Sequence, residues 1–454
     1  MKLRPSVQLT EQQVQSGLKL VTKDGLAAEA MATLTGGAFL VAMAVSMGAS
    51  SIQIGLLAAL PTFANVAQLF AIWLVQKYRN RRAISIICSF LARFPLLVIG
   101  VLPFIFTGGT SLKALIFLLF FHYIFGSITG ASWNSWMKDL VPEKVLGTYF
   151  SHRTRLVQLV NLTLSLVLAL SLDYVKLHFP QQEMMAYSIM FIAGGVLGML
   201  GVYLMSRTPE PLQPPMPPQN IFKLVSKPLK HKNFRKLLVF NSFWSFALNL
   251  ATPFFTVIMM RTLQLPLSYI IGLSMLSQVS SIAFLKIWGV YSDRYSNKTV
   301  IAICAPVYIG CLLAWAFAGD HMLNMALLVA IHVVSGIAIG GVNLAMNNIV
   351  LKLTPREDAI AFIAARNMIT AIFPAVAPIV GGLLAEFFVA RQIIAVVLAI
   401  CSLRFLKMVQ EEGEIGKEQV LPAMLNHVRA LFVKRKVVPQ IIEQTEQKSM
   451  GNSQ

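Results

Sequence analysis

Twelve apolar stretches, separated by short polar connections, run from residue 26 to residue 408 of the chain. Each stretch has about 17–25 residues, the length that an α-helix needs to cross the hydrocarbon core of a bilayer. The pattern therefore predicts an all-α integral membrane protein with twelve transmembrane helices. We place the spans at residues 26–47, 53–76, 83–105, 113–137, 156–173, 184–205, 237–260, 267–289, 299–318, 323–348, 366–387 and 392–408.

The second half of the chain repeats the first. Several residues around the fourth and fifth predicted spans return 213 positions later. The pairs are Asn134 and Asn347, Leu140 and Leu353, Pro142 and Pro355, Tyr149 and Phe362, and Arg153 and Arg366. The segment Ser51-x-x-Ile54-Gly55-Leu56 returns 217 positions later as Ser268-x-x-Ile271-Gly272-Leu273. Matches at a nearly constant offset of about half the chain indicate an internal duplication. We therefore expect two pseudo-symmetric six-helix bundles, residues 26–205 and 237–408.

Three polar segments frame these bundles: residues 1–25, 206–236 and 409–454. The middle one begins with a proline-rich run, Pro209–Pro218, which favours an extended linker, and it ends in a basic stretch. In the last one, apolar residues between 420 and 432 recur at helical spacing, and the basic run Lys434-Arg435-Lys436 follows them. This pattern predicts an amphipathic helix that lies on the inner surface of the membrane.

Composition and charge narrow the class of protein further. The chain of 454 residues is 56% hydrophobic and 13% charged, with a formal net charge of +19. The basic residues flank apolar spans instead of forming a polar domain, which excludes nucleic acid as the partner and leaves the lipid bilayer. The connections on one side of the predicted spans hold 20 basic residues, and those on the opposite side hold 4. Because cytoplasmic loops carry the excess of Lys and Arg, we predict a multi-pass protein of the cytoplasmic membrane with both termini inside the cell.

Two loop motifs add a family resemblance. The run Gly289-Val-Tyr-Ser-Asp293-Arg294-Tyr-Ser-Asn-Lys298 resembles the loop signature Gly-x-x-x-Asp-Arg-x-Gly-Arg-Lys of the major facilitator superfamily. The run Ala377-Pro378-Ile-Val-Gly381-Gly382 is similar to a glycine-proline motif of its antiporters, although that motif belongs to the fifth span and here lies in the eleventh. The resemblance implies two bundles related by an axis along the membrane normal, with a binding site between them near the middle of the membrane.

Polar side chains inside the predicted spans are the candidates for that site, because such groups are costly in lipid. They are Glu29, Arg93, His122, His332, Asn241 and Asn249. A pair of Glu29 with Arg93 could couple protonation to a conformational change. Each candidate has a structural alternative: Arg93 could bind helix carbonyls, Glu29 could reach the membrane surface, and the His and Asn side chains could join helices.

A second group of candidates lies at the predicted cytoplasmic ends of the helices. The family signature implies that Asp293 and Arg294 form a charged latch between helices. The symmetry-related residues Asn134 and Asn347 are expected to be gate or helix-capping groups. We place Arg153 and Arg366, which repeat in the same way, in this gate group.

These observations predict secondary active transport of an unidentified small molecule by alternating access, driven by protons and carried out by a monomer. The alternative is a membrane assembly or scaffolding factor that uses the same fold without transport. The sequence contains no metal-ligand spacing, nucleophile elbow, phosphate loop or dinucleotide fingerprint, so we expect neither an enzyme nor a bound cofactor or metal. The four cysteines all lie in apolar spans, which gives no reason to expect disulfides.

Overall fold

The computed structural model describes residues 5–6, 8–106, 109–142, 145–212, 226, 228–315, 323–354, 359–384 and 387–411. The first half contains α1 (Glu11–Thr35), α2 (Gly37–Ser46), α3 (Ser51–Ala64), η1 (Asn65–Ala67), α4 (Gln68–Tyr78), α5 (Arg81–Ile105), α6 (Gly109–Leu140), α7 (Leu146–His178), η3 (Pro180–Gln182) and α8 (Glu183–Arg207). The second half contains α10 (Lys232–Ala251), α11 (Pro253–Arg261), α12 (Leu267–Arg294), α13 (Asn297–Ala314), α14 (Leu323–Leu353), α15 (Ala359–Leu383) and α16 (Phe388–Met408).

The helices confirm the predicted all-α membrane fold. Within the described ranges, eleven helical segments are long and apolar enough to cross a membrane, and residues Ile369–Leu383 form a shorter apolar helix. The predicted helix at 417–432 and residues 213–225 of the linker lie outside the described residues.

The first helix begins earlier than the apolar pattern predicts. The prediction started the first span at residue 26, whereas α1 begins at Glu11 and continues, after a break at Gly36, into α2. Thr10 and Gln13 form a capping box that satisfies the first free backbone N–H groups of α1. Val21 and Asp24 are buried, so residues 11–25 pack as part of the first bundle, although their polarity suggested a separate segment.

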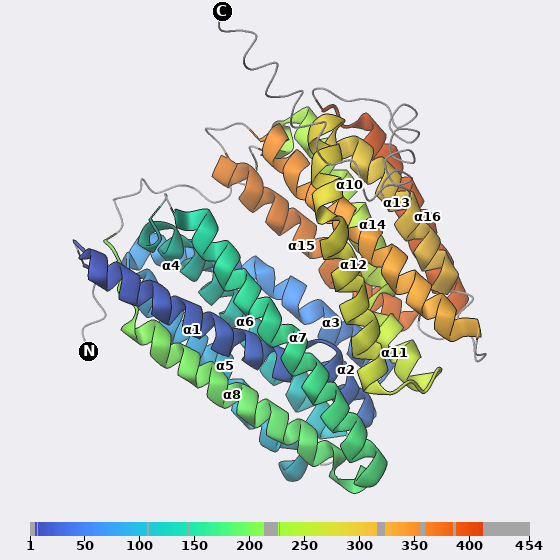
Figure 1. Cartoon of the computed structure of the whole chain (residues 1–454), viewed down its shortest axis with the longest axis horizontal. Helices are drawn as coiled ribbons and strands as arrows, with labels where there is room; N and C mark the ends of the chain where they lie inside the picture. Colours follow the sequence, from blue (N-terminus) through green and yellow to red (C-terminus); the bar gives the residue numbers. More distant parts are fainter. Residues whose placement is uncertain are drawn as a thin grey trace, which may run out of the picture.

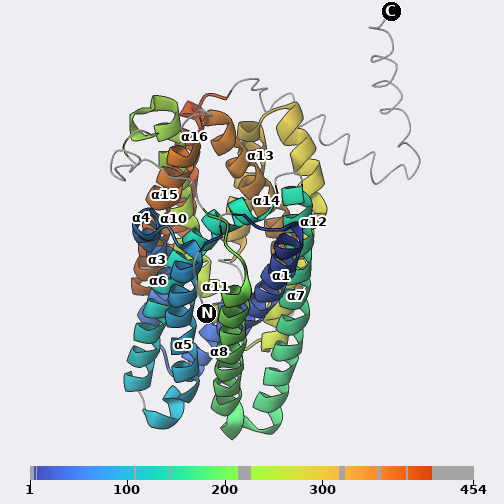
Figure 2. The same cartoon turned by 90° about the vertical axis from the view of Figure 1, so that its left-hand side faces the viewer.

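The two halves form two bundles that lie one below the other in Figure 2. We call the face that carries Thr10, Arg207 and Glu411 the terminal face, and the opposite face, with residues 47–50 and 262–266, the far face. The excess of basic residues on the terminal face predicts that this face is cytoplasmic. The bundles meet near α2, α3 and α11, and their terminal ends point apart (Figure 1).

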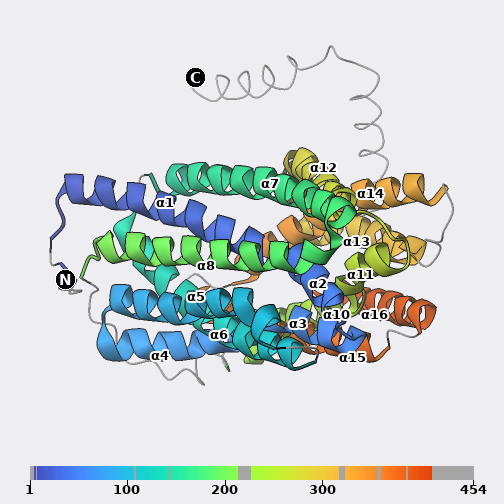
Figure 3. The ribbon, with the colours of Figure 1, turned by 90° about the horizontal axis from the view of Figure 1, so that it is seen from below.

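Contacts between the halves follow the repeat. Helix α3 of the first half packs against α15 of the second, and α7 of the first packs against α12 of the second, as Figure 3 shows for the latter pair. Near the far face, α2 contacts α11. Val257, Leu267 and Ile271 of the second half belong to the same buried apolar cluster as Leu40 and Met43 of the first. The apolar core is therefore continuous between the halves at the far face.

Candidate functional site

A cavity of about 240 Å³ lies between the halves, and we call it the boundary cavity. It is bounded by α1, α7 and α12, at the point where the break at Gly36 and Gly37 separates α1 from α2. Its polar lining residues are Glu29, Thr33, Asn161, Ser165, Ser274 and Gln278. A polar cavity where two bundles meet is the arrangement that a transporter uses to bind a solute.

Glu29 is the charged group among the described residues that line the boundary cavity. Its carboxylate oxygen Oε1 accepts a hydrogen bond of 2.9 Å from Nδ2 of Asn161 on α7. The same Nδ2 donates to the hydroxyl of Thr33 at 3.1 Å. Thr33 lies one helical turn after Glu29 on α1, so the two side chains share a face of that helix. The carboxylate is therefore held by α7 of the same half, at a cavity that α12 of the other half also lines.

Arg93 lies in a different cavity, inside the first bundle. This inner cavity has a volume of about 260 Å³ and is lined by residues of α1, α5, α6, α7 and α8. Nη1 of Arg93 lies 3.6 Å from a carboxylate oxygen of Asp24 and donates a 2.7 Å hydrogen bond to the carbonyl of Gly198. A Cβ at Gly201 would meet this nitrogen and a carboxylate oxygen of Asp24, so a larger residue there would displace the ion pair.

The ion pair of Arg93 is therefore with Asp24, and the hypothesised pair with Glu29 does not form. Sequence reasoning assigned Asp24 to the polar N-terminal segment because the apolar run begins after it. In the structure, Asp24 is buried in α1 and faces α5. The capping-box residues Thr10 and Gln13 indicate that the helix begins before the apolar run, and this signal could have placed Asp24 within it.

The two histidines have different surroundings. Nδ1 of His122 lies 2.8 Å from the carbonyl oxygen of Ala92 on the neighbouring helix α5, and His122 lines the inner cavity. Nδ1 of His332 lies 2.7 Å from the carbonyl oxygen of Leu328 on its own helix. The two side chains are therefore not equivalent, although they lie on repeated helices.

The two asparagines of the seventh predicted span both lie on α10, away from the boundary cavity. Asn241 is buried in the second bundle, and Nδ2 of Asn249 donates to the carbonyl of Ser245 on the same helix at 2.8 Å. The described lining of the boundary cavity includes neither of them.

The predicted gate residues lie on the terminal face. Nη1 of Arg366 donates to the side-chain oxygen of Asn347 at 3.2 Å, so the structure joins two of them in the second half. In the first half, Asn134 is exposed, and the guanidinium of Arg153 lies 5.0 Å from the ring centre of Trp133, where it lines the inner cavity.

Asp293 and Arg294 are both exposed on the terminal face. The guanidinium of Arg294 lies 5.5 Å from the ring centre of Tyr295. The latch role of this pair stays a prediction.

Two glutamates that the sequence pattern did not single out each join helices of one bundle at the terminal face. Glu210 follows the end of α8 by three residues, and its carboxylate accepts hydrogen bonds from the backbone N–H groups of Arg81 and Arg82 at 2.8 and 3.1 Å. The buried side chain of Arg81 lies between this carboxylate and Asp139 of α6. Glu210 thus caps α5 and joins three parts of the first bundle.

Glu411 has the equivalent position in the second half, three residues after the end of α16. Its carboxylate accepts from the backbone N–H groups of Asn297 and Lys298 at 3.2 and 2.8 Å, at the start of α13. Lys352 contributes the positive charge, with Nζ 3.3 Å from the same carboxylate. Lys352 lies 213 positions after Asp139, so the repeat has exchanged an acid for a base.

Within the described ranges, no cluster of three His, Cys, Asp or Glu side chains could hold a metal ion. The polar groups described at the boundary cavity are hydroxyls, amides and one carboxylate.

Comparisons with known proteins agree with this architecture. A point mutant of the nucleoside transporter NupG has a TM-score of 0.68 at 15% identity, over 88% of this chain and 100% of that one. A bacterial homolog of the human lysosomal transporter Spinster, inward-facing and unoccupied, has a TM-score of 0.62 at 15% identity, over 88% and 98%. A D-xylose-proton symporter has a TM-score of 0.62 at 14% identity, over 88% and 98%. Likeness at this level of identity shows the fold.

No curated protein sequence gave a match. A family model described as Major Facilitator Superfamily matches residues 25–321 and 237–439. The fold and the transporter neighbours support membrane transport of a substrate over scaffolding, and such transporters are usually not enzymes. Because the family model covers most of the chain, the protein belongs to the Major Facilitator Superfamily.

Proposed function

We propose that the protein is a proton-coupled secondary active transporter in which Glu29 binds the driving proton and the boundary cavity binds the solute. The observation that carries the proposal is the position of Glu29 between the halves, with its carboxylate bonded to Asn161 of α7. A change in its charge alters a contact that lies beside α12 of the other half. Protonation is thereby linked to the relative position of the two bundles.

The lining of the boundary cavity favours a solute without net negative charge. Hydroxyl and amide groups of Thr33, Asn161, Ser274 and Gln278 supply donors and acceptors, and Glu29 supplies a negative charge. An anion would meet this carboxylate without a described basic residue in the lining to balance it. The substrate class that fits is therefore a small neutral or cationic molecule rich in hydrogen-bond donors.

The arrangement of the halves supports alternating access. They pack together at the far face and point apart at the terminal face (Figure 1). If the terminal face is cytoplasmic, as the distribution of Lys and Arg predicts, this is an inward-facing conformation of a protein of the cytoplasmic membrane. We expect one chain to hold a complete transport pathway, because both bundles contribute to the cavity.

The test begins with a thermal-shift screen of the purified protein against metabolites, since a ligand of the folded state raises its apparent stability. The hit is then measured in proteoliposomes with and without a proton gradient. Glu29→Gln should abolish gradient-driven accumulation and keep solute exchange, because the neutral side chain preserves hydrogen bonds but cannot release a proton. Glu11→Gln, an exposed carboxylate on the same helix, is the control and should accumulate normally. Accumulation by Glu29→Gln at the level of the unmodified protein would contradict the proposal.

A further inference from the structure

Helix α12 begins without a cap of its own. Its N-cap residue is Pro266, which has no side-chain hydrogen bond to the helix. The first backbone N–H groups of a helix have no partner within the helix and require one from elsewhere. Here the partner is Asp173 of α7, in the other half of the protein. Its Oδ1 accepts from the N–H of Leu267 at 2.8 Å, and its Oδ2 accepts from the N–H of Ser268 at 2.7 Å.

The equivalent helix of the repeat is capped in a simpler way, by a residue next to its own first turn. The equivalent helix of the first half, α3, is capped by its own Ser50, whose hydroxyl accepts from the N–H of Gln53, while the Gln53 side chain bonds back to the N–H of Ser50. The segment that starts at Ser51 corresponds to the one that starts at Ser268. The start of α12 thus has a carboxylate from the first half where the start of α3 has a local capping box.

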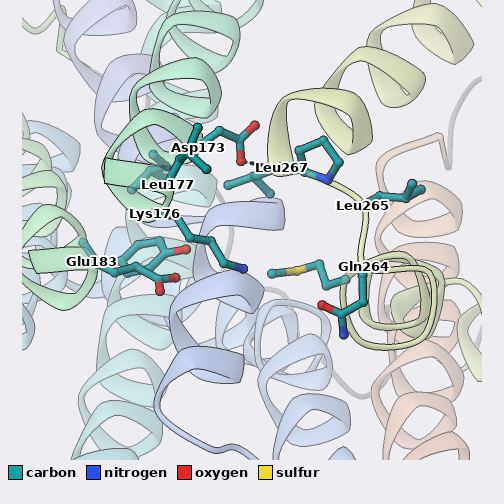
Figure 4. A pocket seen from close by; sticks show the side chains of 11 residues that line it. Asp173, Lys176, Leu177, Glu183, Gln264, Leu265 and Leu267 are labelled. Atoms are coloured by element: carbon teal, nitrogen blue, oxygen red, sulfur yellow. Dashed lines mark hydrogen bonds between the residues drawn. The ribbon is translucent and has the colours of Figure 1, made fainter. Parts of the chain in front are cut away.

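Asp173 lies between two cavities. The boundary cavity includes Ser165, eight residues before Asp173 on α7, and Ile271, four residues after Leu267 on α12. At 1.5 Å per residue, these are distances of about 12 and 6 Å along the two helices. On the other side, toward the far face, Asp173 and Leu267 line a cavity of about 450 Å³, which we call the outer cavity (Figure 4).

The contact between Asp173 and the start of α12 is of a kind that can form and break reversibly. The start of a helix carries a partial positive charge, so a carboxylate there gains both hydrogen bonds and a favourable field. Asp173 is only half-buried, and it lines a cavity together with Lys176 and Glu183. Water can therefore replace the protein partners when the helices separate. Among the described residues, a hydrogen bond from Nη2 of Arg261 to the carbonyl of Ala49, at 2.6 Å, also joins the halves at this face.

We propose that Asp173 is the lock of the far-face gate. Its carboxylate holds the start of α12 against α7 and closes the path between the boundary cavity and the outer cavity. The two hydrogen bonds must break each time the far face opens. The proposal rests on the alternating-access cycle proposed above, but it concerns the equilibrium between conformations and needs neither the substrate nor a role for Glu29.

The test measures access to the boundary cavity. A reporter cysteine, Ser274→Cys, is introduced into a chain whose four native cysteines have been replaced, and a membrane-impermeant maleimide is applied to each side of sealed vesicles. Asp173→Asn removes the charge and one acceptor. We expect the rate of labelling from the far face to rise roughly tenfold or more, because hydrogen bonds to a charged group shift an equilibrium by at least that factor.

A second variant removes the contact from the other side. Leu267→Pro deletes the N–H that Oδ1 accepts, at the first position of a helix, where proline is well tolerated. It should raise labelling in the same direction, and the double variant should add little, because both changes break one contact. This variant also decides the matter if Asp173→Asn does not fold.

Ser50→Ala is the matched control. It removes the cap of a helix on the same face, but both of its partners lie in one half. It should leave labelling from the far face unchanged. The proposal is overturned if folded Asp173→Asn and Leu267→Pro label at the unmodified rate, or if Ser50→Ala labels as fast as they do. Loss of accumulation in Glu29→Gln bears on the proposed function and leaves these rates as they are.

Discussion

The halves meet along two helix pairs, α3 with α15 and α7 with α12, which we call seams. The repeat makes the two seams equivalent, yet they differ in packing. At the seam of α3 and α15, a Cβ added to Gly55 would stand 2.2 Å from the carbonyl oxygen of Pro378. One added to Gly382 would stand 2.7 Å from that of Ser51. On α12, Gly272, the repeat partner of Gly55, is exposed, and a Cβ there would meet no neighbouring atom within 4 Å among the described residues.

The difference separates a packing surface from a binding surface. The α3–α15 seam is closed by contact of backbone with backbone, which only small residues permit. The repeat offset of 213 places Pro378 of this seam opposite Ser165 of the other, and Ser165 lines the boundary cavity. The α7–α12 seam thus borders a cavity with polar side chains, whereas close backbone contacts at Gly55 and Gly382 close its counterpart, and Asp173 holds the α7–α12 seam at its far end. The two seams are equivalent in the repeat, but residue differences make one a packing contact and the other the border of a cavity.

The helix caps at the terminal face differ between the halves in a similar way. Glu210 and Arg81 are both buried, with exposed fractions of 1% and 0%, whereas the side chain of Lys352, which pairs with Glu411, is 48% exposed. An ion pair that is out of contact with water leaves a costly charge behind when one partner is removed. A half-exposed lysine can return to water at little cost.

The largest expected effect follows from this contrast. Glu210→Ala leaves the buried guanidinium of Arg81 with Asp139 as its one acidic partner among the described residues, which should cost about 3–5 kcal/mol of stability. Glu411→Ala should cost about 1–2 kcal/mol, mainly through the lost cap of α13. The comparison is made by thermal and denaturant unfolding of both variants in the same detergent. Equal losses would show that burial of the ion pair does not distinguish the halves.

A smaller effect is expected from the paired glycines. Gly55→Ala places a methyl group against the backbone of α15 and should destabilise the protein by about 1–3 kcal/mol, as overpacking does. It should also raise access to the boundary cavity from the far face, because the seam must widen. Gly272→Ala has space for its methyl group and gains helix propensity, so it should be neutral or stabilising by up to about 1 kcal/mol. Melting temperatures and Ser274→Cys labelling of both variants measure the difference. Similar behaviour of the two variants would remove the distinction between the seams.

The sequence predicted the apolar spans and the duplication because both can be read directly from the order of residues along the chain. Spans follow from runs of apolar residues, and the duplication follows from a nearly constant offset. The contact of Arg366 with Asn347 lies between residues that the repeat had singled out together. Glu29 was a candidate because a carboxylate in an apolar span is rare, and the structure places it at the boundary cavity.

Contacts between distant residues could not be predicted in this way. The partners of Glu210 lie 129 and 128 positions away, and those of Asp173 lie 94 and 95 positions away. No spacing rule relates such residues, since loop paths and helix rotation decide whether they meet. A weak signal existed at α12, where the repeat places Leu267 opposite the capping Ser50. A helix start without a local cap indicates that a partner lies elsewhere, although it does not say which residue that is.

The smallest expected effect concerns the gate asparagines. The repeat makes Asn134 and Asn347 equivalent, but in this conformation only Asn347 bonds to its arginine among the described residues. Asn347→Ala should therefore lower stability by up to about 1 kcal/mol, the value of one hydrogen bond with partial access to water. Asn134→Ala should have no measurable effect, because its side chain is exposed and the guanidinium of Arg153 lies over Trp133.

A double-mutant cycle of Asn347→Ala with Arg366→Ala measures that contact by itself, and the cycle of Asn134→Ala with Arg153→Ala is its matched control. We expect coupling in the first cycle and none in the second when unfolding begins from the conformation described here. If both cycles show equal coupling, the two pairs form the same contact and the halves are alike at the terminal face. If neither does, the bond of Arg366 to Asn347 contributes nothing, and the repeated asparagines owe their positions to the duplication alone.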